Sequence, residues 1–506
     1  MAKAQKNRAS KQMYISQNQL TLEGFESPFS HHLRKDNRWV VLADKIPWDI
    51  LVGTYLKQMN NGSTGADGIN PRVAIGAMII KHMCNLDDRE TVQQIQENMY
   101  MQYFIGYKSF SNEVPFDPSL FVTFRKRLGI EQINEINDRI LGVHPSGDGD
   151  DNTGDTSTVS LDEKACSGTV THKGKLITDA TACPQDIAYP TDLNLLNDAR
   201  KKSEAIIDFL HGLDRQSVKP RTYRKLARKD YLNTAQKKKK TYKVIRQANR
   251  KQLNYLKRNL QNIDAMLDGF KEFPLPPKLQ RYLWIIKEVY RQQRHMYANR
   301  INSIEHRIVS IHQPHVRPIV RGKANANTEF GAKINVSLMN GYAFLDVLSW
   351  DAFNEGTHLM DIVEDYKRRF GYYPQELMAD KIYCTRANRA KLKEIGIRLR
   401  AKPLGRPKAV DVEHVRPGER NPIEGKFGQA KTAYGMNRIK ARLRQTSESW
   451  IATIILVLNL VKLAGEIPYA VILQIFAFSA EVKTVCFAIN PISKNNCWKY
   501  QFLMGN

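Results

Sequence analysis

The sequence predicts an α/β protein: an all-α region at the N-terminus, then a mixed sheet that is interrupted by a basic helical insertion. Three observations indicate this fold class. Residues 39–145 carry apolar side chains at helical spacing, and residues 199–321 do so with a large excess of basic side chains. Short β-type runs stand on both sides of that second region, which is typical of strands that belong to one sheet.

The composition indicates a globular protein that binds nucleic acid. The chain has 506 residues, enough for about two to four domains. A hydrophobic content of 42% is ordinary, but a net charge of +26 is not. So basic a protein most often binds nucleic acid, and an anionic membrane surface is the weaker alternative. Residues 201–300 hold 26 Lys and Arg against 8 Asp and Glu, a net of +18, so the other 406 residues carry only +8.

The N-terminal part begins with a polar stretch, residues 1–38, which we expect to be a loosely held arm. Proline or aspartate opens the first three helices expected in residues 39–145, at Pro47, Pro71 and Asp87, and a fourth is expected after them. The last of these helices follows Phe116-Asp-Pro-Ser and ends in the basic run Arg125-Lys126-Arg127. Several short helices that end in a basic one suit a DNA-binding domain, with phosphate contacts from these three residues. A packing domain with a solvated basic face remains the alternative.

Residues 146–158 are rich in Gly, Asp and Ser and predict a linker. An EF-hand calcium loop is disfavoured because no glutamate closes the acidic cluster. The insertion that follows, residues 199–321, is helical by pattern, and two long antiparallel helices would explain it. Its run Lys237-Lys238-Lys239-Lys240 is either a solvated surface or a phosphate contact, and the local charge of +18 favours phosphate.

Alternating strands and helices are expected after the insertion. Asn340-Gly341 between two apolar runs is a strong hairpin signal. The expected elements are strands at 333–338 and 342–348, a helix at 358–370, a strand at 376–380, a helix at 385–395, a strand at 397–401, a helix from Asn421, and an apolar helix at 447–464 that Gly465 ends.

Cysteine usage and apolar runs bear on the cellular compartment. Six cysteines lack the close spacing of a zinc site, and the N-terminus has no apolar signal region, so a reduced cytosolic protein is expected. The apolar stretches 451–463 and 470–489 contain charged or polar residues and favour buried elements over a membrane span. The tail, residues 466–506, has no interpretation from its pattern.

Three acids stand on separate expected elements. Asp179 closes the strand Lys175-Leu-Ile-Thr, Asp380 closes Glu376-Leu-Met-Ala, and Glu424 lies at a helix start. A mixed sheet would place the strand ends side by side, where carboxylates repel unless cations lie between them. Two Mg²⁺ ions about 4 Å apart would serve, and hard oxygen ligands favour magnesium over zinc. A turn or cap role remains open for each acid taken alone.

The segment Arg420-Asn-Pro-Ile-Glu424 through Lys431 places an acid between two cations. Asn421 is expected to cap the helix, with Pro422 at its first position and Glu424 in its first turn. Glu424 and Lys431 are seven residues apart and therefore share one helix face. A capping box explains Glu424 equally well in isolation.

These residues resemble a known family. The stretches from Leu176 to Leu193, Met378-Ala-Asp380-Lys-Ile-Tyr, and Arg420 to Lys431 resemble bacterial insertion-sequence DDE transposases of the Y-R-E-K signature branch. Residues 71–127 resemble their N-terminal helical domain, and the resemblance extends over roughly residues 40–465. The signature's tyrosine position falls on Pro417, a departure. The resemblance implies a ribonuclease H-like catalytic domain formed by residues 159–198 and 322–465.

The resemblance also implies roles. Asp179, Asp380 and Glu424 would hold two Mg²⁺ ions, for which Mn²⁺ can substitute, while Arg420 and Lys431 would grip the DNA backbone. Lys381 would contact DNA or be a surface lysine. Asp162 and Glu163 are rivals for the first acid, whereas Asp186 and Asp192 suit turn and cap positions.

The resemblance implies a DNA transposase of the bacterial cytoplasm that acts on double-stranded DNA near the nucleoid. Activated water would cut the element's ends, and the freed 3′-hydroxyl would attack target DNA. Two DNA ends imply at least a homodimer, and no membrane partner is expected. Two alternatives stay open: a stand-alone metal-dependent DNA nuclease, and a catalytically inactive transposase-derived DNA-binding protein.

Overall fold

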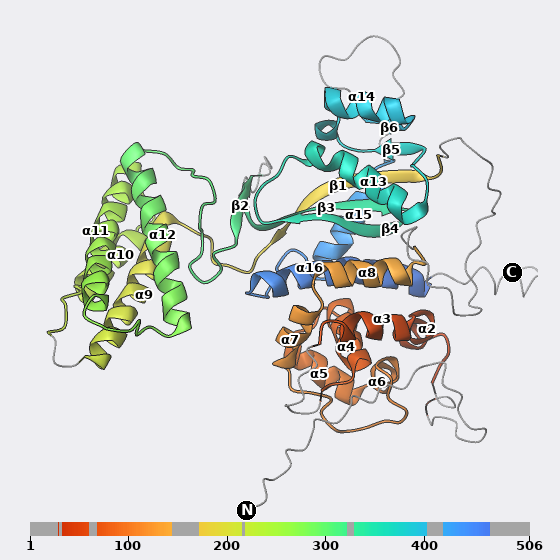
Figure 1. The fold of residues 1–506 in the computed structure, drawn as a ribbon, viewed down its shortest axis with the longest axis horizontal. Helices are drawn as coiled ribbons and strands as arrows, with labels where there is room; N and C mark the ends of the chain where they lie inside the picture. Colours follow the sequence, from red (N-terminus) through yellow and green to blue (C-terminus); the bar gives the residue numbers. More distant parts are fainter. Residues whose placement is uncertain are drawn as a thin grey trace, which may run out of the picture.

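The computed structural model describes residue 29 and residues 33–59, 68–143, 172–214, 218–320, 328–401 and 418–465 (Figure 1). Several predicted features lie outside these residues: most of the N-terminal arm, the linker at 146–158, Asp162, Glu163, Pro417 and the tail at 466–506.

The N-terminal region is helical, as predicted. Asn70 caps one helix by accepting from the Arg72 amide, with Pro71 in the first turn. Asp87 caps the next by accepting from the amides of Arg89 and Glu90. The helices are α2 (Arg38–Lys45), α3 (Trp48–Leu56), α4 (Pro71–Met83), α5 (Asp88–Glu97), α6 (Met99–Phe104), α7 (Leu120–Arg127) and α8 (Ile130–Ile140).

The insertion contains four helices among its described residues, where two long ones were expected. They are α9 (Asp192–Leu213), α10 (Arg224–Ala235), α11 (Tyr242–Leu267) and α12 (Pro277–Asn299). Proline at 276 and 277 starts α12, and the four-lysine run forms the turn between α10 and α11. The four helices bury a hydrophobic cluster of their own and form a lobe beside the sheet (Figure 1).

The sheet is mixed, as predicted. Its strands are β1 (Lys175–Pro184), β2 (Arg317–Val320), β3 (Thr328–Met339), β4 (Tyr342–Ser349), β5 (Glu376–Met378) and β6 (Arg398–Arg400). The order is β2-β3-β1-β5-β6, and β4 also pairs with β3. Strand β1 runs antiparallel to β3 and parallel to β5, and β5 runs parallel to β6. This curled mixed sheet is consistent with a ribonuclease H-like core.

The β3–β4 hairpin confirms the Asn-Gly prediction. Asn340 and Gly341 both have positive φ, at 50° and 80°. A two-residue turn with both central residues in this region matches the twist of the strands it joins, and Asn-Gly is the pair that adopts it most readily. The register on each side therefore follows from local chemistry, with Met339 opposite Tyr342.

Helices cover both faces of the sheet. On one face, α13 (Leu359–Phe370) and α14 (Arg386–Ile395) bury a cluster that includes Leu176, Leu377 and Tyr383. On the other face lie α15 (Asn421–Thr432) and α16 (Arg444–Gly465). Two short 3₁₀ turns, η1 (Glu355–His358) and η2 (Lys381–Tyr383), pack against each other beside α13 and α14.

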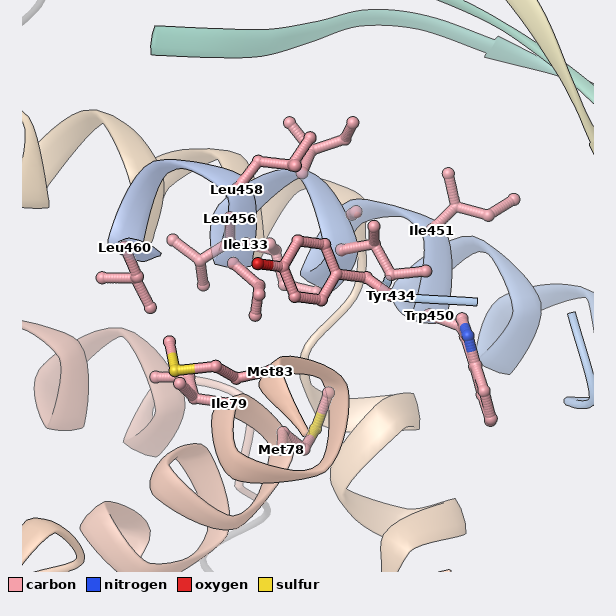
Figure 2. Packing of buried hydrophobic residues seen from close by; sticks show 14 of the residues in the cluster. Met78, Ile79, Met83, Ile133, Tyr434, Trp450, Ile451, Leu456, Leu458 and Leu460 are labelled. Carbon is pink, nitrogen blue, oxygen red and sulfur yellow. The ribbon is translucent and has the colours of Figure 1, made fainter. Parts of the chain in front are cut away.

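Helix α16 joins the sheet to the N-terminal helices. Figure 2 shows Trp450 and Leu460 of α16 among Met78, Ile79 and Met83 of α4, and all of these residues belong to one hydrophobic cluster with the sheet. Among the described helices, α16 alone has the length and apolarity of a membrane span. Residues Thr446–Leu460 are almost all buried within the protein, as expected for a core helix.

Candidate active site

The strand register brings Asp179 and Asp380 together. Ile177 of β1 pairs with Met378 of β5 in a parallel ladder. Asp380 lies two residues after the end of β5. Asp179 lies two residues further along β1 than Ile177, so its side chain points to the same face as Ile177. That face is the one covered by α15, because Ile177, Met378 and Ile423 of α15 share a hydrophobic cluster.

Arg420 bridges the two aspartates. Its Nη2 lies 3.1 Å from Asp179 Oδ2, and its Nη1 lies 3.2 Å from Asp380 Oδ1. The side chains of Arg420 and Asp179 are 20% and 18% exposed, whereas that of Asp380 is 54% exposed. One guanidinium thus offsets the repulsion between two carboxylates on adjacent strands.

Two local predictions need correction. Asp179 lies in the middle of β1, which continues to Pro184 because it pairs with β3 as far as Gly331. Asp380 does follow β5, and it caps η2 by accepting from the Lys381 amide. Arg420 occupies the N-cap position of α15 without a side-chain cap hydrogen bond, so Asn421 is the first residue of the helix rather than its cap.

The third predicted acid lies one helical turn beyond the bridging arginine. Glu424 is four residues after Arg420, in the first turn of α15, and its side chain is exposed. Residues four apart on a helix lie on the same side. Lys431 is in the last turn of α15 and is half-buried. Among the described residues, Glu424 forms no ion pair with Arg420, and it does not form a group of metal-binding spacing with Asp179 and Asp380.

Burial dominates the electrostatics of Asp179. It raises the pKa of the Asp179 carboxyl, and the charge of Arg420 only partly offsets this. The negative charges of Glu355 and Asp380 raise that pKa further. Burial therefore disfavours the charged form of Asp179 more than Arg420 stabilises it.

A polar layer lies behind Asp179 on the opposite face of the sheet. Thr178 Oγ1 donates to Asn335 Oδ1 at 2.8 Å, and Asn335 Nδ2 donates to Tyr383 Oη, also at 2.8 Å. All three residues are buried. Burial, and then the nearby charges of Glu355 and Asp179, raise the pKa of the Tyr383 phenol, so it stays neutral and can hold this network.

Glu355 is an acid that the sequence interpretation missed. It opens η1, and its Oε1 lies 2.9 Å from Lys333 Nζ, with both side chains mostly buried. The signal that could have identified it is its place: it follows strand β4 and precedes a helix, much as Asp380 follows β5. It acts on Asp179 through its charge rather than through a hydrogen bond.

The donor set fits a hard divalent cation. Asp179 and Asp380 present adjacent carboxylate oxygens, the ligands that Mg²⁺ and Mn²⁺ prefer. Among the described residues, no group of three His, Cys, Asp or Glu side chains has metal-binding spacing. Arg420 stands between the aspartates, and Glu424 would complete a three-carboxylate set only if that guanidinium moved away.

The remaining predicted phosphate contacts differ in exposure. Lys381 is exposed beside Asp380, and Lys126 is exposed on α7. Arg127 donates to Tyr55 Oη at 3.1 Å. Arg125 is only 3% exposed, pairs with Asp88 and lies over the Trp450 ring, so it packs the core and does not face DNA, contrary to the prediction. Lys237, Lys238, Lys239 and Lys240 are all exposed in the turn between α10 and α11.

Asp186 and Asp192, which were expected at turn and cap positions, both have ion-pair partners. Asp186 Oδ1 lies 2.9 Å from Arg438 Nε. Asp192 starts α9 and pairs with Arg307 at 2.6 Å, while the preceding Thr191 provides the cap that was expected of Asp192. Among the described cysteines, Cys84 and Cys384 are free thiols.

Comparisons with known proteins match both ends of the described chain. Residues 377–461 match the transposase DDE domain family, and residues 27–127 match the transposase domain family DUF772. The first match includes Asp380, Arg420, Glu424 and Lys431. The uncharacterized protein ORF8 in the nfe locus of Rhizobium meliloti is 29% identical over 159 residues, which is 31% of this chain and 66% of that protein. No solved structure matches.

Proposed function

Because this chain belongs to the DDE transposases of insertion sequences, we propose that it cuts DNA at the ends of an insertion sequence and joins those ends to target DNA. The observation that carries the proposal is that Arg420 bridges Asp179 of β1 and Asp380, which follows the neighbouring parallel strand β5. Two carboxylates held side by side repel each other unless positive charge lies between them, so this arrangement suits a site that binds cations and, through them, phosphate.

In this proposal Asp179, Asp380 and Glu424 hold two divalent ions, Mg²⁺ with Mn²⁺ as a substitute. When bound, the ions supply Lewis-acid stabilisation of the reacting phosphodiester and help to activate water or a 3′-hydroxyl. Glu424 is exposed in the first turn of α15, so its side chain can turn toward the aspartates without disturbing the core.

The cationic side chains orient the DNA. Arg420 leaves the aspartates when positive charge is supplied there, and its guanidinium then faces the phosphate beside the site. Lys431 lies eleven residues after Arg420, about 16 Å further along by the rise of 1.5 Å per residue, and holds a neighbouring part of the backbone. Lys381, exposed beside Asp380, provides a third contact.

The substrate is double-stranded DNA, and the reaction needs two ends held at once. We infer that the complex contains at least two copies of the chain and forms on DNA in the bacterial cytoplasm, at the nucleoid. The net charge of +26 suits this partner.

Cleavage of duplexes that carry the element's own ends tests the proposal. Wild type with Mg²⁺ should nick these ends and yield joined molecules, whereas Asp179→Asn, Asp380→Asn and Glu424→Gln should bind the duplex but cut at least about a thousandfold more slowly, since several kcal/mol of stabilisation is lost. Asp361→Asn is the matched control, because Asp361 is 78% exposed on α13.

The products separate the alternatives. Cut but never joined DNA from wild type would indicate a nuclease without strand transfer. Binding without any cutting would indicate an inactive DNA-binding protein. Cleavage at the wild-type rate by all three acid variants would refute the site assignment.

A further inference from the structure

Helix α11 is packed on three of its sides. Its inward face is buried against the other helices of the lobe, through Gln252, Leu256, Asn259 and Ile263. Arg200 of α9 donates to Gln252 Oε1, and Asn259 donates to Ser203 Oγ of α9. The fourth side of the helix is therefore the one left for solvent or a partner.

The two flanks of α11 are occupied by α10 and α12. On the α10 side, Lys251 Nζ and Tyr255 Oη lie 2.9 Å and 3.0 Å from the Asp230 carboxylate. On the α12 side, Lys287 Nζ lies 2.7 Å from Asp264 Oδ1. The Arg246 guanidinium lies 4.0 Å from the centre of the Tyr297 ring.

The outward face of α11 is a single stripe of basic and amide side chains. Six residues of α11, spaced three or four positions apart, lie within about 40° of one line along the helix surface, at 100° of rotation per residue. All six are exposed. We call them the α11 stripe: Lys243, Gln247, Arg250, Asn254, Lys257 and Gln261. The stripe contains no acid and no apolar residue.

The geometry of the stripe is regular. Lys243, Arg250 and Lys257 are seven residues apart, so about 10 Å separates each from the next. From Lys243 to Gln261 the stripe is about 27 Å long, the length of about eight base pairs at 3.4 Å each. The exposed Lys240 in the preceding turn continues it at the N-terminal end.

Nearby acids do not cancel this charge. Asp230 and Asp264 flank the stripe, but each is already paired with a lysine from the same lobe. The exposed Asp268 lies seven residues beyond Gln261, past the C-terminal end of the stripe, at the C-cap of α11. The stripe and its surroundings thus keep the positive sign that the composition of residues 201–300 gives the lobe as a whole.

We propose that the α11 stripe binds the sugar–phosphate backbone of duplex DNA, as a docking surface separate from the carboxylate site. The proposal rests on the proposed function only in taking DNA as the substrate. Basic side chains contact phosphates, and the interleaved amides donate to phosphate oxygens or reach base edges. Protein–protein interfaces instead have apolar and aromatic centres that are depleted of lysine. The stripe has no such apolar centre.

Fluorescence anisotropy with the full chain and a labelled duplex of arbitrary sequence tests this surface. The triple variant Lys243→Gln, Arg250→Gln, Lys257→Gln should bind about a hundredfold more weakly at about 0.1 M salt. The slope of log affinity against log salt should become shallower by about 3, since three phosphate contacts are lost.

The matched control removes the same charge from the same lobe but away from the stripe: Lys201→Gln, Lys271→Gln, Lys278→Gln, all at exposed positions. It should keep nearly the wild-type salt slope. Equal losses in the two triples would show that only net charge matters and would overturn the proposal. An unchanged salt slope in the stripe triple would overturn the proposal as well. If sedimentation then showed that the triple variant no longer self-associates, the stripe would be a protein–protein contact instead.

The acid variants keep the two proposals apart. Asp179→Asn should bind DNA like wild type while failing to cut it, and the stripe triple should fail at binding. If the stripe triple shows the expected shallower salt slope but wild type never cuts DNA, the stripe proposal stands and the transposase proposal falls.

Discussion

Arg369 Nη1 lies 3.5 Å from Asp346 Oδ1, and the two side chains are only 6% and 1% exposed. Ser337 Oγ also donates to the same carboxylate oxygen, at 3.0 Å. Burial nevertheless raises the pKa of Asp346 to about 7, because the cation and the hydroxyl only partly offset the loss of water. This carboxyl belongs to β4 and contributes to stability, not to the candidate site.

The raised pKa of Asp346 predicts a pH dependence of stability. An acid whose pKa is higher when folded binds more protons in the native state, so its contribution is largest below about pH 4 and is lost as pH rises toward about 7. Asp346→Asn removes this titration. The change in Tm across that pH window should therefore be smaller in the variant than in wild type by about 3 °C or more. Circular dichroism melts measure it, and the exposed Asp361→Asn should keep the wild-type slope.

Removal of Arg420 should destabilise the protein in the absence of divalent ions. Arg420→Ala leaves Asp179 and Asp380 facing each other without a cation, at a cost of about 1–3 kcal/mol. Mg²⁺ should then raise Tm more in the variant than in wild type, because the ion no longer displaces a guanidinium. Thermal melts in chelator and in Mg²⁺ measure this.

Arg438→Ala provides the matched control for that experiment. Arg438 pairs with Asp186 in the same way but is 67% exposed, so its loss should cost little. An equal Mg²⁺ response in wild type and Arg420→Ala would contradict the idea that Arg420 and the metal compete for the same carboxylates.

The hydroxyl of Tyr383 should matter for the layer beneath Asp179. Tyr383→Phe leaves the buried Asn335 amide without its acceptor and should cost about 1–3 kcal/mol in unfolding free energy. Urea titration measures it. Tyr372→Phe, at a partly exposed ring, should change stability far less, and the reverse ranking would contradict the network.

Helix α16 should couple the N-terminal helices to the sheet. Ile451→Ala removes a fully buried side chain from their shared cluster and should cost about 2–5 kcal/mol. Both regions should still melt together, because they share that cluster. Ile50→Ala, at a 43% exposed position, should have a small effect, and separate melting of the N-terminal helices would argue against one shared core.

Local chemistry explains what could be predicted from sequence. The hairpin at Asn340-Gly341 and the helix capped by Thr385 and ended at Gly396 are set by turn and cap residues within a few positions. Asp380 was placed after a strand for the same reason, since strand β5 is short and its end is marked in the sequence.

Long-range packing explains the errors. The end of β1 depends on its pairing with β3, over 150 positions away, so Asp179 was wrongly placed at a strand end. Arg125 is buried because Trp450, near the other end of the chain, packs against it. The place of Glu355 between a strand and a helix marks it only as a candidate, because its effect on Asp179 depends on charges that folding brings together.

The position of α16 has a consequence for how the protein is made. A ribosome completes α4 about 360 residues before it reaches α16, the helix that covers α4. Until α16 is made, the apolar face of the nascent N-terminal helices stays exposed to solvent. Loop closure over such a distance is slow relative to local folding. Chains that stop early would thus be candidates for chaperone capture and proteolysis, which would keep incomplete copies from accumulating on DNA.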